Sequence, residues 1–160
     1  MTLERFIERW TTPNYPPMLV SEQDLAKAEA ELGVRFPTEY RAEVLRCGFP
    51  CPTLALLDSI VDNELNVADV SDFLDPISIV NTSRSWHEIG LPAHLIAFAT
   101  DCMGNLFCFS CALPTSASNV FFFDHDEGSV HQVASSFTDW IDGLANLPAS
   151  SQMSAFRRQD

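Results

Sequence analysis

Basic residues are scarce in this chain of 160 residues. Nine Lys and Arg stand against 22 Asp and Glu, which gives a formal net charge of -13 at pH 7 and a pI near 4.4. Nucleic acids and anionic membranes attract clusters of Lys and Arg, because their phosphates are negative. The composition therefore argues against direct binding to either of them.

The deficit of positive charge is concentrated in one part of the sequence. Residues 47–156 contain 13 acidic side chains and a single basic one, Arg84. An acidic surface of this kind can serve solubility alone, and it can also be built to meet a basic partner. Charge by itself leaves both interpretations open.

Long hydrophobic runs are absent as well. No uncharged apolar stretch reaches the roughly 18 residues that a spanning helix needs, so none is predicted. The segment Met1–Trp10 mixes charged with apolar residues and lacks the basic, apolar and small-residue regions of a secretory signal. We expect a cytoplasmic protein that makes no contact with a membrane.

Motifs that mark an enzyme are missing. The six glycines form no phosphate-binding loop, there is no Gly-x-Ser-x-Gly segment, and the four histidines have no metal-ligand spacing. Asp124-His125-Asp126 is the most suggestive cluster, but on a strand its carboxylates point to one face and its imidazole to the other. We predict no catalysis, metal or other cofactor. A metal-dependent enzyme that uses Asp124 and His125 is the rival hypothesis.

The five cysteines are an odd number in a chain without an export signal, which indicates a reducing compartment. The pairs Cys47/Cys51 and Cys108/Cys111 suggest a four-thiolate zinc site as one possibility. On a strand, however, side chains three positions apart point to opposite faces. The sequence favours mostly buried thiols without a metal.

The length fits a single domain, and 46% hydrophobic residues supply its core. Apolar spacing, a capping box at Ser21, helix-ending glycines and Pro76 at a helix start predict several helices. They cover residues 2–9, 21–32, 38–47, 76–89 and 135–144. The second and third of these form a helical hairpin through a Gly-x-x-x-Pro link.

Alternating and aromatic-rich runs separated by turn residues predict strands at 94–100, 105–111, 119–124 and 129–134. Residues 53–61 are interpreted as a further strand, and 63–72 as an acidic loop that is partly strand. The predicted fold class is α+β: an antiparallel sheet of about five to six strands with helices packed on one face, an N-terminal helical hairpin and a C-terminal helix. The predicted divisions are 1–20 (helix and Pro-rich lead-in), 21–147 (α+β domain) and 148–160 (flexible tail).

Three blocks of the sequence carry a family resemblance. They are Leu25-x3-Glu29-x2-Leu32-Gly33-x2-Phe36-Pro37-x2-Tyr40 before a helix that ends at Gly48, Leu95-Ile-Ala-Phe98-Ala-x-Asp101-x2-Gly104-Asn105-x2-Cys108-Phe109, and Val120-x3-Asp124-His-Asp126 followed by Ser136-Phe137-x2-Trp140-Ile141-x2-Leu144. In order and spacing they resemble the SUKH superfamily, which includes the Smi1/Knr4 domain of fungi and many bacterial immunity proteins. The resemblance covers roughly residues 20–146. Met103 departs from it, because an acidic or polar residue is usual there.

The resemblance implies a bacterial immunity protein that binds a cognate interbacterial toxin domain and neutralises it by stoichiometric protein–protein interaction. The acidity of the chain indicates a basic toxin, and a nuclease is the class that must itself be positive. A Smi1/Knr4-like regulatory or scaffolding module is the alternative. We expect a monomer before the complex forms.

The candidate partner-binding residues are carboxylates in two segments. Six fall within eighteen residues that contain no Lys or Arg, and three lie between the last two predicted strands. Apolar residues among the first six either anchor the partner or face the core, and the sequence leaves both open. The nine candidates are Asp58, Asp62, Glu64, Asp69, Asp72, Asp75, Asp124, Asp126 and Glu127.

Overall fold

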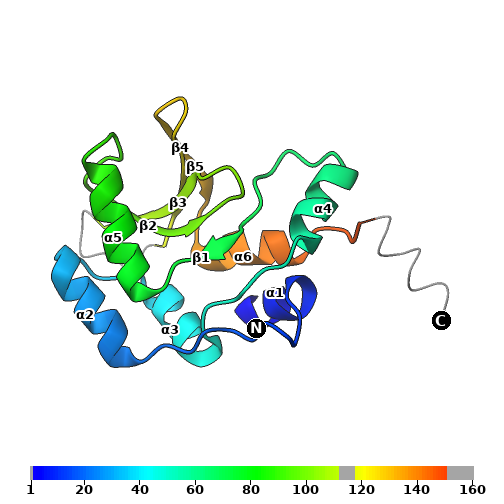
Figure 1. Ribbon diagram of the computed structural model, residues 1–160, viewed down its shortest axis with the longest axis horizontal. Helices are drawn as coiled ribbons and strands as arrows, with labels where there is room; N and C mark the ends of the chain where they lie inside the picture. Colours follow the sequence, from blue (N-terminus) through cyan, green and yellow to red (C-terminus); the bar gives the residue numbers. More distant parts are fainter. Residues whose placement is uncertain (1, 112–117, 151–160) are drawn as a thin grey trace.

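The computed structural model describes residues 2–111 and 118–150, which form six helices and a five-stranded antiparallel sheet (Figure 1). The helices are α1 (Thr2–Trp10), α2 (Glu22–Leu32), α3 (Thr38–Cys47), α4 (Ala55–Asp62), α5 (Pro76–His87) and α6 (Phe137–Ala145). The strands are β1 (Asp72–Phe73), β2 (Leu95–Thr100), β3 (Leu106–Ser110), β4 (Val120–Asp124) and β5 (Ser129–Ala134). The predicted α+β class is confirmed.

The strands lie in the order of the sequence, β1-β2-β3-β4-β5, and each pairs antiparallel with the next. The two-residue β1 forms one edge, with Asp72 opposite Thr100, and β5 forms the other. Because consecutive strands are neighbours, the turns β2–β3 and β4–β5 emerge at the same end of the sheet. The candidate site is built at that end.

One face of the sheet carries the main core. Alternate residues of β2, β3 and β4 point to it, and Phe98 stacks on Phe109 with ring centroids 4.0 Å apart. Tyr40 from α3 and Phe137 and Trp140 from α6 pack against these rings. The sequence predicted helices on one face of the sheet without identifying the face, and α3 and α6 pack on this one.

The opposite face has a smaller apolar cluster formed by the remaining alternate residues, including Leu106, Cys108 and Phe123. Helix α5 runs along β2, and its Ser83 hydroxyl accepts a hydrogen bond from the Ala97 backbone N–H at 3.0 Å, where β2 has a bulge. Trp86 near the end of α5 then covers Phe123. This side of the sheet is therefore covered by a single side chain of α5, that of Trp86, where it lies over Phe123.

Helix α1 is part of the main core. Its Leu3, Phe6 and Trp10 are buried, and the Trp10 indole donates to the Leu144 carbonyl of α6 at 2.8 Å. Figure 1 shows α1 lying beside α6, and the two helices pack together. The proposed division at residue 20 therefore separates two segments that share one core. Residues 151–160 of the predicted tail lie outside the described residues.

The predicted helix ends agree with the capping chemistry. Ser21 forms a capping box with Asp24, and Gly33 takes φ 65° at the end of α2, a conformation that costs a glycine little. The Asp75 carboxylate caps α5, with Pro76 at its first position. The two helices of the predicted hairpin pack on different neighbours, α2 on α5 and α3 on α1 and α6.

The prediction of a strand at residues 53–61 is wrong, because residues 55–62 form α4. Leu56, Ser59 and Ile60 point inward at helical spacing, while Val61 is exposed. A short apolar run of this kind fits a strand and a helix equally well when only periodicity is considered. The contact that distinguishes them is distant in sequence: the Ser59 hydroxyl donates to the Pro148 carbonyl.

None of the helices in the described ranges is long and apolar enough to cross a membrane.

Candidate functional site

Asp101 organises the turn between β2 and β3. Its side chain is buried, and Oδ1 accepts hydrogen bonds from the backbone N–H groups of Met103 at 2.9 Å and Asn105 at 2.8 Å. Oδ2 accepts from the Asn105 side-chain amide at 2.9 Å. An aspartate suits this position because one carboxylate can accept from several donors at once. The turn is thereby held in one conformation.

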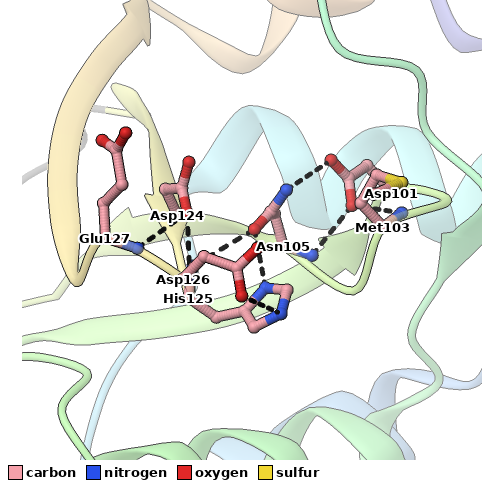
Figure 2. A network of polar contacts seen from close by, with 7 residues as sticks. All are labelled: Asp101, Met103, Asn105, Asp124, His125, Asp126 and Glu127. Carbon is pink, nitrogen blue, oxygen red and sulfur yellow. Dashed lines mark hydrogen bonds and ion pairs between the residues drawn. The ribbon is translucent and has the colours of Figure 1, made fainter.

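Asn105 connects this turn to the turn between β4 and β5 (Figure 2). Its Oδ1 accepts from the His125 backbone N–H at 3.1 Å and lies 2.7 Å from His125 Nδ1, which donates the second bond. The His125 ring also meets Trp86 edge-on, with centroids 5.8 Å apart. The two turns and the end of α5 form a single rigid corner.

Asp124 closes the second turn. Its Oδ1 accepts from the backbone N–H groups of Asp126 at 3.0 Å and Glu127 at 3.1 Å. This arrangement directs the Asp126 and Glu127 side chains into solvent, and the Asp126 side chain is 81% exposed. Asp126 Oδ1 lies 3.4 Å from His125 Nε2.

Asp69 is directed inward. It is only 6% exposed, and its Oδ1 accepts from the Cys102 backbone N–H at 3.1 Å. Its role in the fold is to attach the acidic segment to the β2–β3 turn, next to the pairing of Ser71 with Thr100. Of the predicted set it is the residue whose charge is least accessible to a partner.

The other candidates of the acidic segment differ in position and exposure. Asp58, Asp62 and Glu64 are exposed on α4 and just after it, whereas Asp72 is exposed on β1. Asp75 is half-buried, and its Oδ1 accepts from the Ser78 N–H at 2.8 Å as the cap of α5. The structure thus places Asp69 beside the β2–β3 turn, Asp72 opposite Thr100 at the end of β2, and Asp124, Asp126 and Glu127 at the β4–β5 turn, whereas Asp58 and Asp62 belong to α4.

No Lys or Arg in the described ranges forms an ion pair with any of the nine candidate carboxylates. The arginine ion pairs of those ranges lie on α1, α2 and α3 instead, as in Arg41 with Glu29 and Arg46 with Glu43. The carboxylates at the turns therefore have backbone amides, Asn105 and His125 as neighbours, and no Lys or Arg of the described ranges pairs with them. The corner thus differs from α1, α2 and α3, where carboxylates pair with arginines.

The model of the SMI1/KNR4 family (SUKH-1) matches residues 19–143, most of the chain. The chain belongs to this family. No curated protein matches it. The SUKH resemblance predicted from three blocks of sequence is confirmed, and the blocks now have structural reasons. In the first, the Glu29 carboxylate accepts from the Phe36 N–H and pairs with Arg41; in the second, Asp101, Gly104 and Asn105 build the turn.

Two further kinds of chemistry bear on this corner, metal binding and the reactivity of the thiols. The described residues contain no group of three or more His, Cys, Asp or Glu placed to hold a metal ion. Each of the five cysteines is unpaired, and Cys108 and Cys111 belong to different apolar clusters, as strand alternation predicted. The pKa of the Cys102 thiol is raised to about 11, first by desolvation and then by the Asp69 carboxylate. Cys102 is therefore a neutral thiol at neutral pH.

Sequence reasoning missed three residues of this SUKH corner as contributors to the site. The sequence places Asp101 and Asn105 only in the predicted turn and in the second resemblance block, and it assigns no role to Trp86. The Asp101-x3-Asn105 spacing carries a usable signal, because an aspartate often accepts from backbone amides a few residues ahead. The Asn105–His125 and Trp86–His125 contacts carry none, since they join separate elements.

Proposed function

We propose that this SUKH protein is an immunity protein that neutralises a basic toxin domain by binding it stoichiometrically through the corner formed by the β2–β3 and β4–β5 turns. The observation that carries the proposal is the set of carboxylates there that no Lys or Arg of the described ranges pairs with. Membership of a family in which immunity proteins are common supports the same role.

Uncompensated carboxylates favour a cationic partner for a physical reason. Like charges on one surface repel each other, and a partner of opposite sign removes that repulsion when it binds. Complementary charge also accelerates association, from about 10⁵–10⁶ to as much as 10⁸–10⁹ per molar per second at low salt. Rapid capture suits a protein that must act before a toxin does.

The hydrogen bonds of the corner support the same proposal. Asp101, Asn105 and Asp124 bind the backbone of both turns, so the backbone from which the exposed Asp126 and Glu127 side chains project is formed before a partner arrives. Ordering a loop on binding costs free energy, and a preformed loop avoids that cost. A toxin of the nuclease class would offer the complementary surface, because its substrate groove must attract phosphates.

The test is co-expression with the toxin domain encoded by the neighbouring gene, followed by gel filtration and stopped-flow association measurements. We expect rescue of growth and a one-to-one complex. Asp126→Lys with Glu127→Lys should slow association by about tenfold at low salt, with a smaller effect at high salt. Glu8→Lys with Glu31→Lys is the control, because it changes the charge equally on exposed positions of α1 and α2. Failure of the unchanged protein to rescue or to form a complex would refute the proposal.

A further inference from the structure

A second feature of the surface lies away from the two turns. A groove of about 650 Å³ opens between α6, β5 and the segment after α4. Phe107 and Phe122 contribute to it from the sheet, Trp140 and Leu144 from α6, and Leu65 and Val67 from the segment after α4. The three aromatic side chains belong to the main core and form the floor of the groove, each less than 9% exposed, whereas Val67 is 47% exposed. An apolar hollow of this kind can receive an inserted side chain.

The acidic residues around the groove indicate what would occupy it. Asp139 lines the groove, and Glu64 and Asp142 directly adjoin lining residues in sequence. None of these three forms an ion pair with a Lys or Arg of the described ranges. The only arginine there that hydrogen-bonds a lining residue is Arg9, which donates to the Leu147 carbonyl at the α1 side. An apolar hollow that has the exposed Asp139 in its lining, with Glu64 and Asp142 next to lining residues in the sequence, suits an apolar side chain flanked by cations.

We propose that this groove binds an anchor of the toxin, a large apolar side chain between basic residues, while the corner of the two turns attracts the toxin by charge. The inference rests on the proposed function and adds a second contact region to it. The two contact regions should affect different rates. Long-range attraction, and with it the association rate, depends on exposed carboxylates, whereas the residence time of the complex depends on buried apolar contacts.

A second copy of this chain is a poorer occupant. Two molecules that each carry a net charge of -13 repel one another. The adjoining edge strand β5 also has a register shift opposite Val120 and Phe121, and bulges of this kind hinder edge-to-edge pairing of sheets. A basic partner is attracted by the negative charge and does not need to pair with the edge of β5.

Gly143 offers a way to block the groove without damaging the fold. It lies in α6 and lines the groove, and a Cβ at this position would meet no atom within 4 Å. Replacing a helical glycine also removes its entropic cost, so Gly143→Phe should fold at least as well as the parent protein. Gly143→Ala is the matched control for the helix effect, and Gln23→Phe, on an exposed position of α2, is the control for added apolar surface.

The first experiment uses the full chain and a probe peptide, RKLFKR with blocked ends, followed by ¹H–¹⁵N NMR. We expect shifts at the groove residues, including the Trp140 indole, and no such shifts with RKSSKR. Gly143→Phe should lower the affinity for the peptide RKLFKR roughly tenfold or more, whereas Gly143→Ala and Gln23→Phe should leave this affinity unchanged. Equal shifts with both peptides would overturn the inference. So would a peptide that binds only after Phe156→Ser, since the chain's own terminal residues would then be the occupant, or a dimer that Gly143→Phe dissociates.

The second experiment uses the toxin and separates this inference from the proposed function. Gly143→Phe should increase the dissociation rate about tenfold with little effect on association, the opposite of the Asp126→Lys and Glu127→Lys pair. If Gly143→Phe leaves a normal complex, the groove inference is wrong and the proposed function stands. If the unchanged protein binds RKLFKR but no toxin, the proposed function is wrong, and the toxin is excluded as the occupant.

Discussion

Carboxylates in two regions of this molecule are satisfied in different ways. On α2 and α3 they face arginines: Glu29 Oε1 lies 3.0 Å from Arg41, and Glu43 Oε2 lies 2.9 Å from Arg46. At the turns of the sheet Asp101 and Asp124 bind backbone N–H groups instead. The first region, residues 22–47, holds four basic side chains for its six acidic ones, whereas the turns contain no Lys or Arg, so their carboxylates keep their negative charge and still have their hydrogen bonds.

The difference shows how one chain can be both well folded and strongly charged. A backbone amide stabilises a carboxylate without cancelling its charge, since the amide is a dipole and not a cation. The α2–α3 region uses its charges internally to connect two helices that pack on different neighbours. The turn region directs its charge outward, which is what recognition of a basic partner requires.

The largest expected effect is on stability when the Asp101 carboxylate is removed. Asp101→Ala should lower the free energy of unfolding by about 3 kcal/mol, because three hydrogen bonds to a charged group are lost and buried donors lose their acceptor. Urea denaturation measures it. Asp101→Asn should cost about half as much, since one oxygen still accepts from the backbone.

The control for Asp101 is Asp126, an exposed carboxylate of the same corner. Asp126→Ala should change stability by no more than about 0.5 kcal/mol. If Asp101→Ala proved equally mild, the idea that amide-bound carboxylates hold the turns would be wrong.

The next effect concerns the arginine-paired region. Glu29→Ala should cost about 2 kcal/mol, because the half-buried carboxylate binds both the Phe36 N–H and Arg41. A double-mutant cycle with Arg41→Met isolates the ion pair, for which we expect a coupling of about 1 kcal/mol or less. Salt should reduce this coupling and leave the Asp101→Ala loss almost unchanged. Equal salt dependence at both sites would remove the distinction between the regions.

Local sequence chemistry predicted much of this fold. Ser21, Gly33 and the Asp75-Pro76 pair identified helix ends, and the turns of the sheet were placed by their glycines and asparagines. The strand expected at 53–61 failed because Ser59 and Ile60 find their inward positions only through distant contacts. Acidity identified the region of the candidate site but not the direction of each side chain. Asp69 turns inward to the Cys102 amide, 33 residues away, and no local pattern encodes that contact.

A smaller effect compares the same backbone conformation after two helices, α2 and α4. Gly33 follows α2 with φ 65°, and Glu64 follows α4 with φ 52°. Glu64→Gly should raise the free energy of unfolding by up to about 1 kcal/mol, because a left-handed conformation strains a residue with a side chain, and one repelling carboxylate is also lost. Gly33→Ala should lower it by about 1 kcal/mol. Thermal denaturation of both variants compares them, and a destabilised Glu64→Gly would contradict the strain argument.

The smallest expected effect is on the rate at which the Cys102 thiol, in the β2–β3 turn, is alkylated. The Cys102 thiol is exposed, yet its pKa is raised to about 11, first by desolvation and then by Asp69. Because only the thiolate reacts, alkylation by iodoacetamide at pH 8 should be slower than in the unfolded protein and should increase as the pH approaches 11. Asp69→Asn keeps an oxygen for the Cys102 N–H but removes the charge, so it should lower the thiol pKa and speed the reaction at pH 8. Peptide mass spectrometry measures the rate at this cysteine. An unchanged rate in Asp69→Asn would mean that the field of uncompensated carboxylates does not reach the neighbouring thiol, and the contrast between the two regions would then be one of hydrogen bonding alone.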